Sequence, residues 1–232
     1  SVIRQLSEFA TARGQEIGYE NVFDYSLGNP SVPVPQEFTD TMMHMLSTKE
    51  PNVLHGYSPS LGITSVREAV AASLERRFGL PYRKEHIFMA SGAAGALAHA
   101  FRLVTEPSDE ILTFAPFFPE YHPYVDLTGA ALKVVPPDTE SFQINFEAFK
   151  ELLTEKVMAI LINTPNNPSG VVYSDETLKK LAEVLKEKSE QYGHEIYLIS
   201  DEPYREIVFE GTKIPCVSQF YDNTIMCYSF SK

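Results

Sequence analysis

Short apolar runs alternate with helical patterns over the last two thirds of the chain. The apolar runs occupy residues 87–90, 111–114, 132–135, 157–162, 196–199 and 225–228. Patterns with helical spacing separate most of them, at 92–104, 121–127, 146–153 and 175–192, the last capped by Ser174. Strands joined by helices of this length form parallel sheets whose two faces are covered by helices. The pattern therefore predicts an α/β fold of three layers, helices on either side of a mostly parallel sheet.

The first eighty residues contain helical patterns without such strands. Apolar residues at helical spacing predict helices that carry residues 2–10 and 38–46, with a proline-rich connector at 25–35 between them. Ser65 and Glu68 have the spacing of a capping box, which predicts that a third helix begins there.

Composition narrows the classes of protein to consider. The formal net charge of −12, from 31 acidic and 19 basic residues, opposes binding to nucleic acid. Two cysteines are too few for a disulfide framework, no apolar run is as long as a membrane span, and the first residues lack the order of a signal peptide. The six histidines lack metal-ligand spacing, so no metal site is predicted. We expect a cytoplasmic protein without a membrane or nucleic-acid partner.

Polar clusters follow three of the apolar runs. They read Asn-Thr-Pro-Asn-Asn-Pro-Ser-Gly at 163–170, Ser-Asp-Glu-Pro-Tyr-Arg at 200–205 and Ser-Phe-Ser-Lys at 229–232. In an open parallel sheet, ligands bind in the crevice beyond the carboxyl ends of the strands. The three clusters therefore predict one site that contains Asn, Asp, Tyr and Lys side chains.

Each of these side chains has a chemical and a structural interpretation. A desolvated Lys232 has a lowered pKa and attacks carbonyls, although a solvated chain end is the simpler reading. Asp201 after a buried strand needs a cationic partner such as a protonated pyridine nitrogen, or it only caps a turn. Tyr204 and Asn167 can hydrogen-bond a hydroxyl of the same ring, although the asparagine motif is also a turn signal.

Two further segments suggest a phosphorylated, planar ligand. Small residues at 91–96 join a strand to a helix, so that the free N–H groups of the helix can hold a phosphate, or they only permit tight packing. Ser229 can add a hydroxyl to that phosphate. The aromatic pair at 117–118 can stack on a ring, or belongs to the core.

Jointly, these motifs resemble those of the fold type I pyridoxal-phosphate enzymes, and within them the class I/II aminotransferases of the aspartate aminotransferase type. The resemblance runs from about Gly28 to Lys232. It implies that residues 51–232 form the cofactor-binding large domain, and that residues 1–50 form an N-terminal arm and the start of a small domain.

The resemblance also implies a role for each matching residue. Lys232 would form the internal aldimine with pyridoxal 5′-phosphate and would then move the substrate's α-proton. Asp201 would keep the pyridine nitrogen protonated, while Asn167 and Tyr204 would hydrogen-bond the 3′ oxygen.

Other matches concern the phosphate, the ring face and the substrate. The N–H groups of Ala93 and Ala94, with Ser229, would hold the phosphate, and Phe118 would stack on the ring. Tyr57 would reach the phosphate in a neighbouring subunit, which implies a homodimer with shared sites. Gly28 would approach the carboxylate of the amino acid or 2-oxo acid substrate, and Asn167 would border the same substrate.

Three functions follow from these matches. The favoured one is amino-group transfer between an amino acid and a 2-oxo acid; a carbon–sulfur lyase and a cofactor-binding regulatory module without turnover are the alternatives.

The family's arginines for the phosphate and the substrate carboxylate would follow Lys232. We therefore expect the chain to be the first part of a longer enzyme whose C-terminal remainder is absent, and residues 1–232 alone to aggregate.

Overall fold

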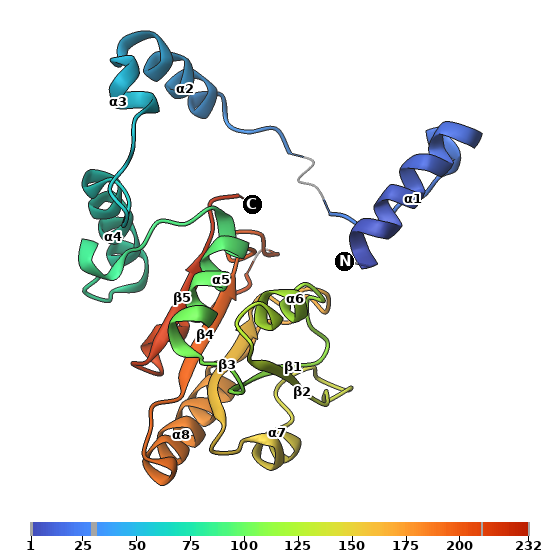
Figure 1. Cartoon of the computed structure of the whole chain (residues 1–232), viewed down its shortest axis with the longest axis vertical. Helices are drawn as coiled ribbons and strands as arrows, with labels where there is room; N and C mark the ends of the chain where they lie inside the picture. The colour runs from blue at the N-terminus through green and yellow to red at the C-terminus, as the bar shows by residue number, and fades with distance from the viewer. Residues whose placement is uncertain (1, 29–31, 210, 232) are drawn as a thin grey trace. The chain divides into compact units, whose positions relative to one another are not determined.

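The computed structural model describes residues 2–28, 32–209 and 211–231, which form two compact units, Ser1–Pro59 and Ser60–Lys232 (Figure 1). The N-terminal unit contains the helices α1 (Val2–Ile17), η1 (Tyr19–Asn21), α2 (Gln36–Thr48) and α3 (Pro51–His55). The first two predicted helices are confirmed, and α1 is longer than predicted. The short helix α3, with Pro51 at its start, was not predicted.

The N-terminal unit has no buried hydrophobic side chain among its described residues. Most of its large apolar side chains are exposed instead, and they include Val2, Leu6, Phe9, Phe23, Phe38, Met43, Leu46 and Val53. Helices of this length gain most of their stability from packing an apolar face against another element. This unit therefore does not supply its own hydrophobic core.

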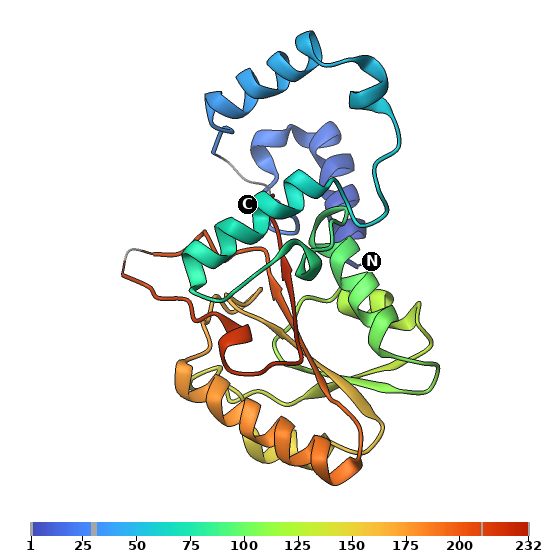
Figure 2. The ribbon, with the colours of Figure 1, turned by 90° about the vertical axis from the view of Figure 1, so that its left-hand side faces the viewer.

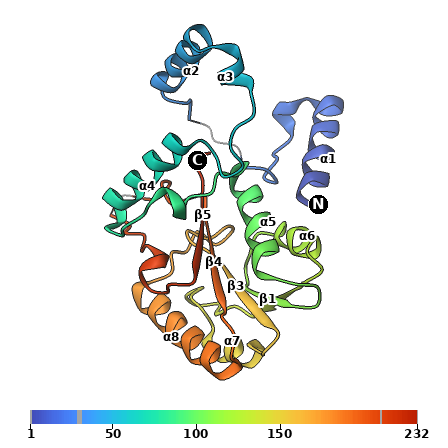
Figure 3. The same cartoon turned by 60° about the vertical axis from the view of Figure 1, so that its left-hand side comes forward.

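The C-terminal unit is built on a parallel sheet with the strand order β2-β1-β3-β4-β5 (Figures 2 and 3). The strands are β1 (Glu110–Phe114), β2 (Ala131–Val135), β3 (Val157–Asn163), β4 (Tyr197–Glu202) and β5 (Thr224–Tyr228). Every pairing between these neighbours is parallel. The α/β fold that the hydrophobic pattern predicts is confirmed.

Helices cover both faces of the sheet. On one face, α5 (Gly92–Val104) and α6 (Tyr121–Asp126) enclose a core that includes Phe101 and Leu161. On the other face, α7 (Phe146–Leu152) and α8 (Asp175–Tyr192) pack over a core that includes Phe149, Ile160 and Leu181. Ile160 and Leu161 are neighbours in β3 and point to opposite faces, as a pleated strand requires. Both faces are buried, which explains why the strands read as continuous apolar runs.

The order of the strands places a switch point at the carboxyl ends of β1 and β3. The chain leaves β1 through α6 to reach β2, and it leaves β3 through α8 to reach β4 on the other side. Right-handed crossovers in opposite directions put these two helices on opposite faces of the sheet. The loops after β1 and β3 consequently diverge, and they leave a crevice in which ligands of such sheets bind.

The helix ends test two sequence predictions. The start of α8 is confirmed, because the Ser174 hydroxyl accepts a hydrogen bond from the Thr177 N–H at 3.0 Å. The capping box is wrong: α4 (Thr64–Phe78) begins after Ile63 without a side-chain cap. Glu68 forms an ion pair with Lys84 instead, because the helix starts one residue before Ser65.

The predicted strand at 87–90 is also wrong, because this segment pairs with no strand in the part of the chain that the structure describes. The Met89 N–H donates to the carbonyl of Leu61 at 3.2 Å. The Ile87 carbonyl accepts from the buried guanidinium of Arg67 at 2.8 Å. The Ile87 carbonyl and the Met89 N–H thus have partners that do not belong to the sheet.

Leu181→Ala should lower the free energy of unfolding by about 2–5 kcal/mol, because it leaves a cavity in the core beneath α8. Leu103→Ala is the matched control, since Leu103 is also helical but is 79% exposed. Urea unfolding followed by circular dichroism measures both variants. Equal losses would contradict the assignment of the core.

Candidate functional site

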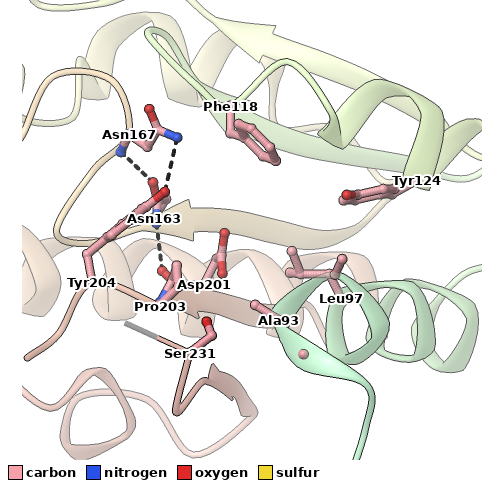
Figure 4. Close-up of a pocket in the computed structure, with 12 residues that line it drawn as sticks. Ala93, Leu97, Phe118, Tyr124, Asn163, Asn167, Asp201, Pro203, Tyr204 and Ser231 are labelled. Atoms are coloured by element: carbon pink, nitrogen blue, oxygen red, sulfur yellow. Dashed lines mark hydrogen bonds between the residues drawn. The ribbon is translucent and has the colours of Figure 1, made fainter. Parts of the chain in front are cut away.

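A pocket of about 260 Å³ lies at the carboxyl ends of β1, β3 and β4 (Figure 4). Its lining residues are Gly92, Ala93, Ala94, Leu97, Phe118, Tyr124, Asn163, Asn167, Asp201, Pro203, Tyr204 and Ser231. The structure thus brings together six residues that the motifs single out, namely Ala93, Ala94, Phe118, Asn167, Asp201 and Tyr204. They come from four separate segments of the chain.

Asp201 belongs to strand β4 rather than to the turn after it. It pairs with Asn163 of β3 on one side and with Cys227 of β5 on the other. The sequence pattern ends the strand at Ile199, because the next residues are polar. The ladder nevertheless continues, so Asp201 is held by a strand on each side.

The carboxylate of Asp201 is only half satisfied. The side chain is 5% exposed, and the Tyr121 hydroxyl donates to Oδ2 at 2.6 Å. Oδ1 is buried without a hydrogen-bond partner among the residues that the structure describes. Burial raises the pKa of Asp201 from 3.8 to about 6, and the hydrogen bond from Tyr121 acts in the opposite direction. A buried, unpaired carboxylate oxygen is costly, so this atom suits a ligand that brings a cationic N–H donor.

Asn167 and Tyr204 form a polar wall beside Asp201 (Figure 4). The Asn167 Nδ2 donates to the Tyr204 hydroxyl at 3.3 Å. Burial raises the pKa of Tyr204, whereas the hydrogen bond from Asn167 lowers it. The pair presents amide and phenol groups that can hydrogen-bond an oxygen on the edge of a ring.

The first turn of α5 forms another wall. Gly92 has a φ of 69°, a conformation that favours glycine, and Ala93 and Ala94 follow it into the pocket. The helix has no side-chain cap at Ser91. Its first N–H groups and the positive end of its dipole therefore suit a phosphate.

Phe118 faces the pocket from the loop after β1, with Leu97 and Tyr124 beside it (Figure 4). Its ring packs edge-on against Tyr121, with centroids 5.7 Å apart. Tyr121 thus contacts both Phe118 and Asp201, and it holds an aromatic ring near the half-satisfied carboxylate.

The remaining predicted residues lie elsewhere. Ser229 is buried, and its hydroxyl lies 2.7 Å from that of Ser231, which lines the pocket. Lys232 lies outside the described residues. Gly28 and Tyr57 belong to the N-terminal unit, in which the Tyr57 side chain is exposed.

A buried ion pair lies behind the pocket and was not predicted. The Arg205 Nε donates to Glu202 at 2.5 Å, and the Ser200 hydroxyl donates to the same carboxylate at 2.7 Å. Burial raises the pKa of Glu202, and Arg205 opposes this effect. Arg205 also donates to the Pro215 carbonyl at 2.5 Å, so the pair ties the turn that carries Tyr204 to the next segment.

The sequence pattern assigns no role to Tyr121 or Asn163 either. Tyr121 follows Phe118 by three residues, and a turn in which the Tyr121 N–H donates to the Phe118 carbonyl at 3.1 Å brings the two together. Asn163 is the polar residue at the end of the apolar strand β3, and this position in the sequence was the one indication that it belongs to the site. Both also bond to Asp201, which is distant in sequence, and only the fold reveals this contact.

Within residues 2–28, 32–209 and 211–231, no group of three or more His, Cys, Asp and Glu side chains could hold a metal ion. No helix in these ranges is long and apolar enough to span a membrane.

The family model described as aminotransferase class I and II matches residues 20–232. Aspartate aminotransferase of Thermotoga maritima is 31% identical over 243 aligned positions, which cover 100% of this chain and 62% of that protein. A probable aspartate/prephenate aminotransferase of Aquifex aeolicus is 31% identical, over 96% of this chain and 56% of that protein.

Solved structures agree with the sequence matches. An amino transferase from Eubacterium rectale superposes with a TM-score of 0.95 and 45% identity, over 100% of this chain and 58% of that chain. The structure of the Thermotoga maritima aspartate aminotransferase gives a TM-score of 0.87 at 29% identity, and 60% of it is covered. The chain therefore spans about three fifths of the length of these relatives.

Asp201→Asn should flatten the pH dependence of stability in the ligand-free protein. Because the folded pKa is raised to about 6, the stability from this group is complete below the unfolded pKa and is lost as pH rises through about 6. Between about pH 4 and pH 7 the variant should lose about 2–3 kcal/mol less unfolding free energy than the wild type. Urea titrations at each pH measure this difference, and parallel pH profiles would contradict it.

Proposed function

The chain belongs to the aminotransferase class I and II family, and from this membership we propose that the protein transfers an amino group between an amino acid and a 2-oxo acid with pyridoxal 5′-phosphate as its cofactor. The observation that carries the proposal is Oδ1 of Asp201, which is buried in the pocket without a partner among the described residues. A protonated pyridine nitrogen is the cationic N–H donor that this atom lacks.

The rest of the pocket fits the other parts of this cofactor. When bound, pyridoxal phosphate supplies an electron-withdrawing ring that stabilises negative charge at the substrate's α-carbon. Asp201 keeps the ring nitrogen protonated, and Asn167 and Tyr204 hydrogen-bond the 3′ oxygen. The neighbouring position of these three side chains in one pocket supports this assignment.

The phosphate and the ring face have candidates of their own. The N–H groups of Ala93 and Ala94 at the start of α5 hold the phosphate, together with the Ser229 hydroxyl. Ser231 contacts Ser229 and lines the pocket, so its hydroxyl is a second candidate to bind the phosphate. Phe118 stacks on the ring.

Lys232 is the proposed amine that holds the cofactor covalently, and its Nζ takes and returns the proton of the substrate's α-carbon. It follows Ser231, which lines the pocket. The role is supported by the place of Lys232 in the sequence, directly after a residue that lines the pocket.

Two copies of the protein are proposed to share their sites. Tyr57 reaches the phosphate in the neighbouring subunit, and Gly28 and Asn167 border the substrate. The exposed apolar side chains of the N-terminal unit support a second copy as the partner that buries them. Residues 1–50 then act as an arm and the start of a small domain, and residues 51–232 as the cofactor-binding large domain. A cytoplasmic location stays a prediction.

The relatives favour transfer over the two alternatives. They are named aspartate, or aspartate/prephenate, aminotransferases. These names do not favour a carbon–sulfur lyase or a regulatory module, and they make aspartate the first amino donor to test.

Purified full-length protein supplied with pyridoxal phosphate should convert aspartate and 2-oxoglutarate to oxaloacetate and glutamate. A panel of amino donors, followed by mass spectrometry of the oxo acids formed, would define the donor. Release of ammonia and pyruvate from a β-substituted donor such as cysteine would instead favour the lyase, and cofactor binding without any turnover would favour the regulatory module.

Borohydride reduction of the cofactor-loaded protein should attach the cofactor to the peptide that contains Lys232, because reduction fixes the imine that the Lys232 amine is proposed to form with the aldehyde. Lys232→Ala should lose this label and its visible absorbance band but keep the circular dichroism of the wild type. Label on another lysine would overturn the assignment.

A further inference from the structure

Asn163 links the main chains of two residues in the pocket. It is the last residue of β3, it is 4% exposed and it lines the pocket. Its Oδ1 accepts a hydrogen bond from the Asn167 N–H at 2.6 Å, and its Nδ2 donates to the Asp201 carbonyl at 2.8 Å (Figure 4). One side chain therefore joins the loop after β3 to strand β4.

Both bonds follow from the place of Asn163 in the sheet. Asn163 lies opposite Asp201 in the parallel register, and the next N–H, that of Thr164, approaches the same Asp201 carbonyl at 3.4 Å. The main-chain ladder ends there, because the loop turns away. The side-chain amide continues the link between the strands by one further bond.

The amide of Asn163 satisfies both partners. It offers an acceptor and a donor on the same end group, whereas a carboxylate offers acceptors alone and an apolar side chain offers neither. The connection then extends from Asn167, whose Nδ2 reaches the Tyr204 hydroxyl at 3.3 Å. Asp201, Asn163, Asn167 and Tyr204 thus form one continuous hydrogen-bonded series.

We infer that Asn163 is a positioning residue that fixes the separation between the carboxylate facing the cofactor's ring nitrogen and the amide and phenol facing its 3′ oxygen. The inference rests on the proposed function, because that function assigns the two ends of the ring to Asp201 and to Asn167 with Tyr204. Asn163 acts through these residues.

Two variants separate the two bonds. Asn163→Ala removes both, whereas Asn163→Asp is isosteric, keeps the acceptor for Asn167 and loses the donor to the Asp201 carbonyl. Asn145→Ala is the matched control, since Asn145 also accepts a main-chain hydrogen bond, from the Ala148 N–H at 3.2 Å, but caps α7 and does not line the pocket.

Three measurements test how each variant changes the site. Hydrogen exchange of the Asn167 amide should become about 10-fold faster in Asn163→Ala and stay near wild type in Asn163→Asp. Pyridoxal phosphate should bind both variants about 10- to 100-fold more weakly. The midpoint pH of the cofactor's visible absorbance band should shift in both. The control should lower the melting temperature without changing any of these three quantities.

The result that overturns the inference is a cofactor affinity and an absorbance midpoint in Asn163→Asp equal to those of the wild type and of Asn145→Ala. This variant decides the question if Asn163→Ala does not fold. Failure of the proposed function is distinguishable, because the wild type would then bind no pyridoxal phosphate or transfer no amino group. An active wild type with unaffected Asn163 variants refutes only the positioning role.

Discussion

The pocket depends on a buried carboxylate that the protein satisfies at one oxygen only. Tyr121 donates to Oδ2 of Asp201, and Oδ1 has no partner among the described residues. Burial without full hydrogen bonding raises the pKa of the acid and costs folding free energy. The same arrangement leaves an acceptor that a cationic ligand can satisfy. A ligand that donates to this oxygen removes the free-energy penalty of the ligand-free fold, and this gain strengthens binding.

The sheet makes this arrangement rigid. Asp201 is paired on both sides in β4, while its neighbour Glu202 faces away from the pocket and is neutralised by the buried Arg205. Two adjacent carboxylates are thus separated by the pleat, and only one is left for a ligand. Across the switch point, Asn166 Nδ2 donates to the Pro116 carbonyl at 3.3 Å, which ties the loop carrying Asn167 to the loop carrying Phe118.

Local sequence patterns predicted most of the fold, because strand and helix periodicities are properties of neighbouring residues. The four covering helices and all five strands lie close to their predicted bounds. The pattern failed at two segments whose structure depends on residues that are distant in the sequence. The Ile87 carbonyl accepts from Arg67, and the apolar run at 87–90 pairs with no strand among the described residues. At the other end of the sheet, β4 continues to Glu202 through polar residues, since pairing with β3 and β5 outweighs their weak strand preference.

For the site, the sequence alone determined which residue types gather at one edge, because the carboxyl ends of parallel strands share that edge. Asn167, Asp201 and Tyr204 were predicted together for this reason, and they line one pocket. Only the tertiary structure decided which atoms are satisfied. Tyr121 and Asp201 are 80 positions apart, and Asn163 and Asp201 are 38 apart. Contacts at such separations depend on strand order and register, which no local pattern encodes.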